Sequence, residues 1–239
     1  PALTFVKPTI MLSVPLVIEK IYQSSIKPSL ESIKLYQNRF FKPLLAKVAG
    51  SKLRKTFGGK LRFFGIGGAA LAPECEAFLK QAGFPYAIGD GLTETSPLLA
   101  GSSPAKTKLR STGPALEGVS LRISSPNTSS GEGELEAKGD NIFKGYYKDA
   151  KRTKEAFTDD GWFKTGDLGF FDARRRLFIR GRSKTMILGA SGENIYPEEI
   201  EALLNQSPFV EESLVLEEDG ALTAMVYLKS EILDDIESK

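Results

Sequence analysis

Along the first hundred residues, segments with the two-residue period of strands alternate with segments that have the 3.6-residue period of helices. Short apolar runs predict three strands, at Thr9–Leu12, Leu61–Ile66 and Tyr86–Ile88. After the second run, Pro73 stands at a favourable first helical position, and the spacing predicts a helix that extends to about Gln81. Strands that alternate with helices in this way predict α/β layers over residues 1–109.

The long segment between the first two strands is helical in period but rich in proline. Leu16 to Ile21 suits one face of a helix, and helical spacing resumes beyond Pro28 and continues to Val48. Pro43 stands inside this second stretch. Because proline lacks an amide donor, we expect it to kink or split the segment.

Two further textures follow. Residues 110–183 contain short strands separated by turn residues, in GVSLRI, GELEAKG, GWFKTGDLGFFD and RLFIRGR, which predicts a small β subdomain. From residue 184 the pattern predicts a strand at Thr185–Leu188 and a helix at Pro197–Leu204. Two more predicted strands, Val210–Leu216 and Leu222–Leu228, make residues 184–239 an α+β unit. The sequence therefore predicts an α/β and α+β chain with a large domain over 1–183 and a small one over 184–239.

The composition excludes several kinds of chemistry. The 239 residues include no histidine and one cysteine, Cys75, which we expect to pack within a helix. A Ser-His-Asp triad, an HExxH metal site, a cysteine-rich zinc site and a disulfide framework are therefore absent from this sequence. Its chemistry has to use carboxylates, lysine, hydroxyls, backbone amides or a bound ion.

The charge is distributed unevenly. Residues 20–62 hold eleven basic side chains and one acidic one, Glu31, in a chain whose net charge is only +2. Such a block could meet the surface of an anionic membrane or serve as a solvated helical face. We expect no nucleic-acid partner, because no base-stacking or groove-reading motif accompanies the charge. No apolar run approaches about 18 residues, and the start of the chain lacks a basic leader, so we expect a cytoplasmic protein with possible peripheral membrane contact.

Two glycine-containing segments resemble phosphate-binding motifs. Gly65 to Ala70 matches G-x-G-x-x-A after a strand, but the helix is expected to begin only at Pro73, whereas a dinucleotide fingerprint opens directly into its helix. The alternative is a loop that crosses the edge of the sheet. Ser124 to Glu134 lacks the lysine and helix of a P-loop and is predicted to be a surface hairpin loop.

The segment DGLTETSP, residues 90–97, follows the third predicted strand. Open α/β sheets bind ligands at the carboxyl ends of their strands. Thr93 can donate to a phosphate oxygen, and Glu94 offers Mg²⁺ a hard oxygen ligand. An ordinary capped turn is the alternative.

Five motifs, taken in order, resemble the adenylate-forming acyl-CoA synthetases, also called AMP-dependent ligases. They are FFGIGGAALAPE, GLTETSP, GELEAKGDNIFKGYYKD, FTDDGWFKTGDLGFFD and GRSKTMILGASGENIYPEEIE. The GRSK and GENIYP forms, and the basic insertion before Gly58, are most similar to the long-chain fatty acid CoA ligase branch. By this resemblance the chain is the C-terminal part of a large adenylation domain followed by an incomplete small domain. The family's phosphate loop is then expected upstream of Pro1 and its adenylation lysine downstream of Lys239, so we expect the chain itself to be inactive.

The resemblance also implies a reaction and roles for residues. A fatty acid and ATP give an acyl-adenylate and pyrophosphate, and the acyl group then passes to CoA, with AMP released. Thr93 and Glu94 are the implied catalytic residues, on the α-phosphate and on Mg²⁺ respectively. The implied nucleotide-binding residues are Gly67, Gly68, Ala69, Asp90, Gly91, Thr93, Asp167 and Arg182. Lys184 is the implied hinge, and Gly189, Ser191, Gly192 and Glu193 are implied to line the CoA channel.

One position departs from the family's pattern. Asp90 stands where the family usually has an aromatic residue that stacks on adenine, and a carboxylate cannot stack. Two alternative functions stay open beside the CoA ligase. One is an acyl-adenylate ligase that loads a carrier protein, and the other is a non-catalytic module that binds lipid or nucleotide.

Overall fold

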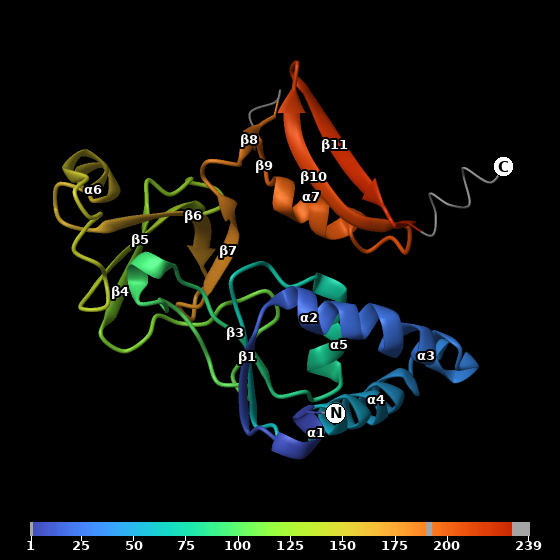
Figure 1. The fold of residues 1–239 in the computed structure, drawn as a ribbon. Coiled ribbons are helices and arrows are strands. Elements are labelled where there is room, and N and C mark those ends of the chain that lie inside the picture. Colours follow the sequence, from blue (N-terminus) through green and yellow to red (C-terminus); the bar gives the residue numbers. More distant parts are fainter. Residues whose placement is uncertain (1, 190–192, 231–239) are drawn as a thin grey trace. The chain divides into compact units, whose positions relative to one another are not determined.

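The computed structural model describes residues 2–189 and 193–230, and the chain forms two compact units (Figure 1). The first comprises Pro1–Arg122, Ala137–Phe163 and Phe171–Phe178, and the second comprises Ile123–Glu136, Lys164–Phe170 and Ile179–Lys239. Strands between residues 119 and 182 therefore contribute to both units.

A parallel sheet organises the first unit. Its three strands are β1 (Ile10–Ser13), β2 (Phe63–Ile66) and β3 (Tyr86–Ile88). Met11 pairs with Phe64, and Phe64 pairs with Tyr86. All three predicted strands are confirmed, with ends that differ by two residues at most.

Helices make the crossover from β1 to β2. After the short helix α1 (Ala2–Val6) and strand β1, the chain forms α2 (Pro15–Ile21), the π-helix η1 (Tyr22–Ile26), α3 (Lys27–Glu31), the 3-10 helix η2 (Lys34–Gln37) and α4 (Lys42–Thr56). The interruption expected before Pro28 is wrong, because η1 joins α2 to α3 and Pro28 lies in the first turn of α3, where a missing N–H costs little. Pro43 lies in the first turn of α4, so the predicted split falls just before it. Within residues 2–189 and 193–230, no helix combines the length and apolar character that crossing a bilayer requires.

The second crossover confirms a predicted helix. α5 runs from Pro73 to Gln81, with Pro73 at its start, Glu74 and Glu76 in its first turn and Lys80 in its last. Acidic residues at the amino end and a basic residue at the carboxyl end both suit the helix dipole. Cys75 is buried on this helix, as expected.

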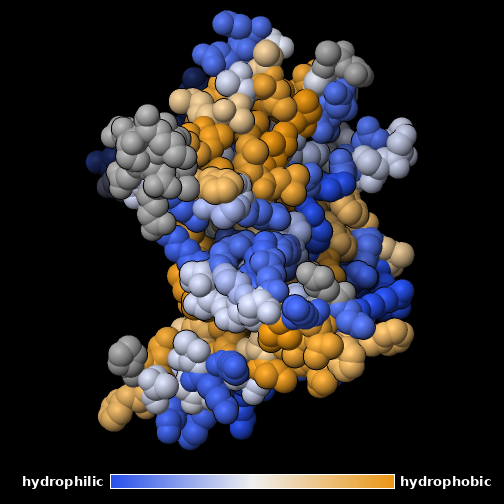
Figure 2. Space-filling view, turned by 90° about the vertical axis from the view of Figure 1, so that its right-hand side faces the viewer, coloured by the Kyte–Doolittle hydropathy of each residue, from blue (hydrophilic) through white to orange (hydrophobic). Residues whose placement is uncertain are grey.

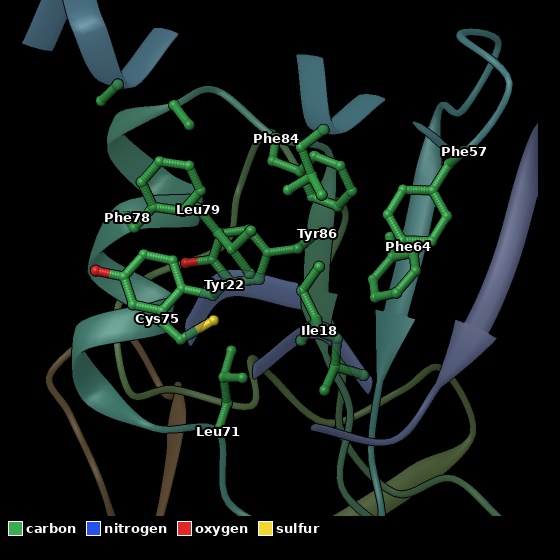
Figure 3. Close-up of a cluster of buried hydrophobic side chains, with 14 of the residues drawn as sticks. Ile18, Tyr22, Phe57, Phe64, Leu71, Cys75, Phe78, Leu79, Phe84 and Tyr86 are labelled. Carbon is green, nitrogen blue, oxygen red and sulfur yellow. The ribbon is translucent and has the colours of Figure 1, made fainter. Parts of the chain in front are cut away.

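The core of the first unit lies between the sheet and these helices (Figure 3). The rings of Phe57 and Phe84 both pack on Phe64, with centroids 5.3 and 5.5 Å away, and Tyr22 packs on Phe78 at 5.1 Å. Along β2, Phe64 and Ile66 are buried, whereas the alternate residues remain partly exposed. The strand thus buries one face against the helices, as its alternating pattern requires.

A four-stranded sheet follows in simple chain order, β4-β5-β6-β7. Its strands are β4 (Val119–Ser124), β5 (Gly133–Gly139), β6 (Phe163–Phe171) and β7 (Leu177–Arg182). The segment between β4 and β5 is an exposed loop, which confirms the hairpin interpretation of Ser124 to Glu134. The pattern did not predict the helix α6 (Ala150–Ala156), which buries no residue and therefore has no apolar period; Asp149 caps it by accepting a hydrogen bond from the Arg152 amide.

The remaining elements belong to the second unit. The short strands β8 (Ile187–Leu188) and β9 (Asn194–Ile195) pair with each other, and α7 (Pro197–Leu204) precedes the hairpin of β10 (Val210–Glu218) and β11 (Ala221–Leu228). The predicted helix at 197–204 is confirmed to the residue, and both strands of the hairpin are confirmed. α7 packs on β10, where the Glu201 carboxylate accepts a hydrogen bond from the Val215 amide at 2.8 Å.

Candidate functional site

The loop of residues 89–97 leaves the carboxyl end of β3 and is tightly folded. The Asp90 amide donates to the Ala100 carbonyl, and the Asp90 carbonyl accepts from the amides of Leu99 and Ala100. Thr93–Thr95 form a 3-10 turn. A Cβ atom on Gly91 would lie 1.9 Å from the Pro97 carbonyl oxygen, so only glycine fits there. Thr95 is fully buried, and its hydroxyl accepts from the Leu92 amide at 2.9 Å and lies 2.7 Å from the Pro97 carbonyl. This internal bonding fixes the turn on which Thr93 and Glu94 stand.

A second segment of the first unit supports this loop from outside. The Asn141 side-chain amide donates to the carbonyls of Thr95 and Leu98, at 2.8 and 3.1 Å. The Phe143 amide donates to the Glu94 carbonyl at 2.8 Å. The Tyr146 hydroxyl donates to the Glu94 carboxylate at 2.9 Å. Thr93 is exposed and Glu94 is half-buried, so the loop presents a hydroxyl and an oriented carboxylate to its surroundings.

Tyr146 is a suitable partner for a carboxylate. Partial burial and the hydrogen bond to Glu94 both raise the pKa of Tyr146, so its hydroxyl stays protonated and donates. Its ring packs on Phe143 at 4.9 Å, and the Arg152 guanidinium lies over it at 4.3 Å. The ring is therefore held from more than one side, which orients the hydroxyl toward Glu94.

The glycine segment at the end of β2 lies beside the start of this loop. A Cβ atom on Gly67 would come within 3.2 Å of the Gly89 carbonyl oxygen, so the two backbones approach closely. Gly68 has φ +87°, in the left-handed region, with open space around its Cα, and Ala69 is exposed. Helix α5 begins only at Pro73. The glycines therefore do not open into the helix, which is contrary to the dinucleotide-binding alternative.

Asp167 and Arg182, in the second unit, form a single polar group. Asp167 on β6 is buried, and its carboxylate accepts a hydrogen bond from the Arg182 guanidinium on β7 at 2.7 Å. Thr165 contributes as well, because its hydroxyl accepts from the Asp167 amide at 3.0 Å and its carbonyl accepts from Arg182 at 3.3 Å. Burial raises the pKa of Asp167, and the neighbouring guanidinium opposes that shift.

The predicted hinge and CoA-channel residues follow β7. Lys184 is exposed in a turn in which the amides of Thr185 and Met186 both donate to the Arg182 carbonyl. Gly189 donates through its amide to the Glu193 carbonyl at 2.8 Å, and a Cβ atom at Gly189 would meet the Glu193 carboxylate. Ser191 and Gly192 lie outside the described residues.

Within the second unit, ion pairs link β7, which precedes this turn, to residues elsewhere in the chain. Arg180 on β7 contacts Glu132 at 2.8 Å and Glu199 on α7 at 3.2 Å. Tyr196 also reaches Glu132, through its hydroxyl at 3.3 Å. Glu132 and Arg180 thus contact residues that follow Lys184 in the chain.

The oxygen donors on the loop suit a hard cation. Mg²⁺ is commonly held by one or two carboxylates together with substrate phosphates, so Glu94 alone meets the requirement for a protein ligand. Over residues 2–189 and 193–230, no cluster of three or more acidic, histidine or cysteine side chains is placed to hold an ion. The donor set is therefore compatible with a metal that arrives with a nucleotide.

Sequence reasoning missed the residues that hold the predicted site residues in place within each unit. Tyr146, Asn141, Thr95 and Thr165 had no assigned role, although the first two belong to the motif GELEAKGDNIFKGYYKD. That motif was a usable signal, since a polar side chain within a recognised motif needs a partner. The partner of Tyr146, however, is Glu94, which lies 52 positions away in the chain.

Comparison with known proteins gives consistent similarities. The family model described as AMP-binding enzyme matches residues 2–147. The chain is 33% identical to the long-chain-fatty-acid–CoA ligase FadD15 of Mycobacterium bovis, over 90% of this chain and 39% of that protein. It is 30% identical to the peroxisomal long chain acyl-CoA synthetase 7 of Arabidopsis thaliana, over 96% of this chain and 37% of that protein. The chain thus spans about two fifths of the length of these curated relatives.

A solved structure agrees in fold. The O-succinylbenzoate coenzyme A synthetase of Bacillus subtilis, in complex with ATP and magnesium ion, superposes with a TM-score of 0.69 and 26% identity. The match covers 98% of this chain and 45% of that structure. The α/β and α+β architecture expected from the sequence is confirmed by this likeness.

Proposed function

The chain belongs to the AMP-binding enzyme family, whose model matches more than half of it, and from this premise we propose that the full-length protein is an AMP-forming ligase joining a long-chain fatty acid to CoA. The reaction proposed has two steps. The fatty acid carboxylate attacks the α-phosphorus of ATP and releases pyrophosphate, and the CoA thiol then attacks the acyl carbonyl and releases AMP.

The observation that best supports this proposal is the held carboxylate of Glu94. It stands at the carboxyl end of a parallel strand, on a loop fixed by Thr95 and Asn141, with Tyr146 donating to one of its oxygens. An ordinary capped turn needs no such support of a half-exposed carboxylate. We propose that Thr93 donates to the α-phosphate and that Glu94 is the protein ligand of Mg²⁺. When bound, Mg²⁺ offsets the charge of the phosphates.

Further roles follow from the chemistry of the other groups. We assign Asp167 to the ribose hydroxyls, because a carboxylate accepts two hydroxyl hydrogen bonds, and Arg182 to the ribose and phosphate region. Gly67, Gly68 and Ala69 would allow the backbone to approach adenine, near Asp90 and Gly91. Lys184 would be the hinge of the small domain, with the segment from Gly189 to Glu193 lining the CoA channel.

The names of similar proteins and the sequence motifs both bear on the acid substrate. The printed name of FadD15 specifies a long-chain fatty acid and that of acyl-CoA synthetase 7 a long acyl chain, whereas the superposed Bacillus structure is an O-succinylbenzoate coenzyme A synthetase. Basic residues ahead of Gly58 and the GRSK and GENIYP forms favour the long-chain branch.

An exchange assay on the full-length protein tests the proposal. With ATP, Mg²⁺ and labelled pyrophosphate, we expect exchange with long-chain fatty acids and little with short-chain acids or 2-succinylbenzoate. Addition of CoA should then yield the thioester. If exchange occurs but the acyl group passes to a carrier protein and not to CoA, the carrier protein is the acceptor. No exchange with any acid would overturn the ligase proposal.

A further inference from the structure

The outer surface of η2 and α4 combines exposed apolar side chains with basic ones. Apolar side chains are exposed at Ile33, Leu35, Phe40, Phe41, Leu44 and Val48. Exposed basic side chains lie among them, at Lys34, Arg39, Lys42, Lys47, Lys52 and Lys55. We call these two sets together the η2–α4 surface.

The helix α4 shows how this surface arises. Ala46, Gly50 and Leu53 are buried and recur at helical spacing, so they form the face that packs on the core. Leu44 and Val48 lie one turn apart on the outward side, beside Lys47. A solvated helical face would carry polar residues at 44 and 48. Figure 2 shows hydrophobic and hydrophilic residues interleaved over the lower part of that view.

The most exposed ring of the η2–α4 surface stands on an ordered turn. Phe40 is 88% exposed. Its amide donates to the Asn38 side-chain oxygen at 2.9 Å, and the amides of Phe41 and Lys42 donate to the Asn38 carbonyl at 3.1 and 3.0 Å. The turn therefore fixes the backbone that presents the ring. An aromatic ring held outward in this way exposes a large apolar area, which is typical of a contact site.

The charge of the surrounding block selects the partner. Residues 20–62 contain eleven basic side chains and the single acidic residue Glu31, and Lys27 pairs with Glu74 from outside the block. A nucleic acid would use the basic side chains and stacking rings, but aliphatic side chains such as Ile33, Leu35 and Leu44 give it nothing to bind. An anionic bilayer uses both sets, because headgroups pair with lysine and arginine while apolar tips enter the boundary of the acyl chains.

We propose that the η2–α4 surface binds peripherally to an anionic lipid bilayer, with Phe40 and its apolar neighbours inserted and the basic residues on the headgroups. This inference does not depend on the proposed catalytic activity. It would place the protein at the phase in which long acyl chains are concentrated.

Vesicle co-sedimentation of the full-length protein tests the electrostatic part. Binding to vesicles containing about one third phosphatidylserine should exceed binding to pure phosphatidylcholine at least about tenfold at low salt, and should fall as salt is raised. A triple variant, Lys34→Gln, Lys42→Gln and Lys47→Gln, should lose at least about tenfold in affinity for the anionic vesicles. The matched control replaces Lys106, Lys151 and Lys154, which are also exposed, by glutamine and should bind as wild type. Equal binding to both vesicles, or equal loss in both variants, overturns the proposal.

The insertion part has its own test. Phe40→Ser should lower vesicle affinity several-fold, whereas Tyr147→Ser, at an equally exposed ring on another segment, should not. The tryptophan introduced by Phe40→Trp should add fluorescence emission that shifts to the blue when anionic vesicles are added. Brominated lipid in anionic vesicles should quench this emission, whereas brominated lipid in neutral vesicles should not. If the added emission is already that of a buried indole in buffer, a protein segment covers Phe40 and the proposal fails. RNA binding that depends on the three lysines but not on Phe40 would also overturn it.

Discussion

Two glutamates of the first unit, eighteen positions apart, stand in contrasting surroundings. Glu76 on α5 is 1% exposed, and its carboxylate accepts from the Arg110 amide at 2.9 and 3.1 Å and from the Tyr86 hydroxyl at 3.1 Å. Glu94 on the β3 loop is half-buried and accepts from Tyr146. The first is enclosed by the chain's own donors, whereas the second is oriented yet open.

This difference separates a group that holds the fold from one that we propose binds a ligand. A carboxylate that is buried and satisfied by its own chain stabilises the native packing, but no substrate reaches it. A carboxylate that is oriented from one side keeps lone pairs for a ligand. The hydroxyls of Tyr86 and Tyr146 therefore both donate to a glutamate carboxylate. The first bond lies in the core, and the second lies at the loop. The predictions below concern the full-length protein.

The largest expected effect is on catalysis at Glu94. Glu94→Gln should lower the rate of ATP–pyrophosphate exchange by about 100-fold or more, because it removes the charged oxygen proposed to hold Mg²⁺. The melting temperature should stay near that of wild type. Glu76→Gln is the matched control, with a wild-type exchange rate per folded molecule. If Glu76→Gln lowered exchange as much as Glu94→Gln, the contrast between the two glutamates would disappear.

The free energy of unfolding should be more sensitive to substitution at Glu76 than at Glu94. Glu76→Gln should lower the free energy of unfolding by about 1–3 kcal/mol, because the amide cannot accept from Arg110 and Tyr86 with both atoms.

The pH dependence of that loss has a definite sign. Burial raises the pKa of Glu76 above its ordinary value, so its contribution is fully present below the unfolded pKa of about 4.3 and declines as the pH rises through the folded value. The difference between wild type and Glu76→Gln should therefore be larger near pH 4 than at pH 8. Urea unfolding across this range measures it, and a difference that grows with pH would contradict the assignment.

Tyr146→Phe should remove the hydrogen bond that orients the Glu94 carboxylate. We expect exchange to fall roughly tenfold, since one hydrogen bond to a charged group contributes about 1.5–3 kcal/mol when it is needed for geometry. More Mg²⁺ should be needed for half-maximal nucleotide binding, measured by calorimetry. Tyr147→Phe, at the neighbouring exposed ring, is the control. An unchanged Mg²⁺ requirement would remove Tyr146 from the site.

Asp167 is an intermediate case, since it is buried like Glu76 but is assigned to a ligand like Glu94. Asp167→Asn should weaken ATP binding by roughly tenfold through loss of charged hydrogen bonds. Because burial raises the pKa of Asp167, its charge costs more in the folded chain than in the unfolded one, so the variant should be no less stable than wild type at pH 7. A variant that was clearly less stable, with unchanged ATP affinity, would make Asp167 purely structural.

The smallest effect is expected at Asp90. Asp90→Tyr should tighten ATP binding by about 1 kcal/mol, or roughly fivefold, if the ring stacks on adenine. Calorimetry with ATP, and with a triphosphate that lacks a purine as the control, measures the gain. Equal gains for both nucleotides, or a loss, would show that adenine is not recognised at this position.

Local pattern determined much of this protein. The boundaries of α5 and α7 were predictable because Pro73 and Pro197 mark helix starts and an apolar stripe follows each. The strands around Phe64 and Tyr86 were predictable because short apolar runs stood between turn residues. Ordered motifs determined the family. Local pattern failed at η1, where a π-helix bridges an expected gap, and at α6, which has no buried face.

Only the tertiary structure decided which side chains meet. Tyr146 reaches Glu94 across 52 positions, Arg182 reaches Asp167 across 15, and Glu76 is enclosed by a backbone amide 34 positions away. No local period encodes such contacts, since each depends on how strands and loops pack. The sequence likewise placed eleven basic residues in one block, but packing alone decided that Phe40, Leu44 and Val48 face outward among them. A helix shows its period in the sequence, whereas the face that it buries depends on the neighbour it packs against.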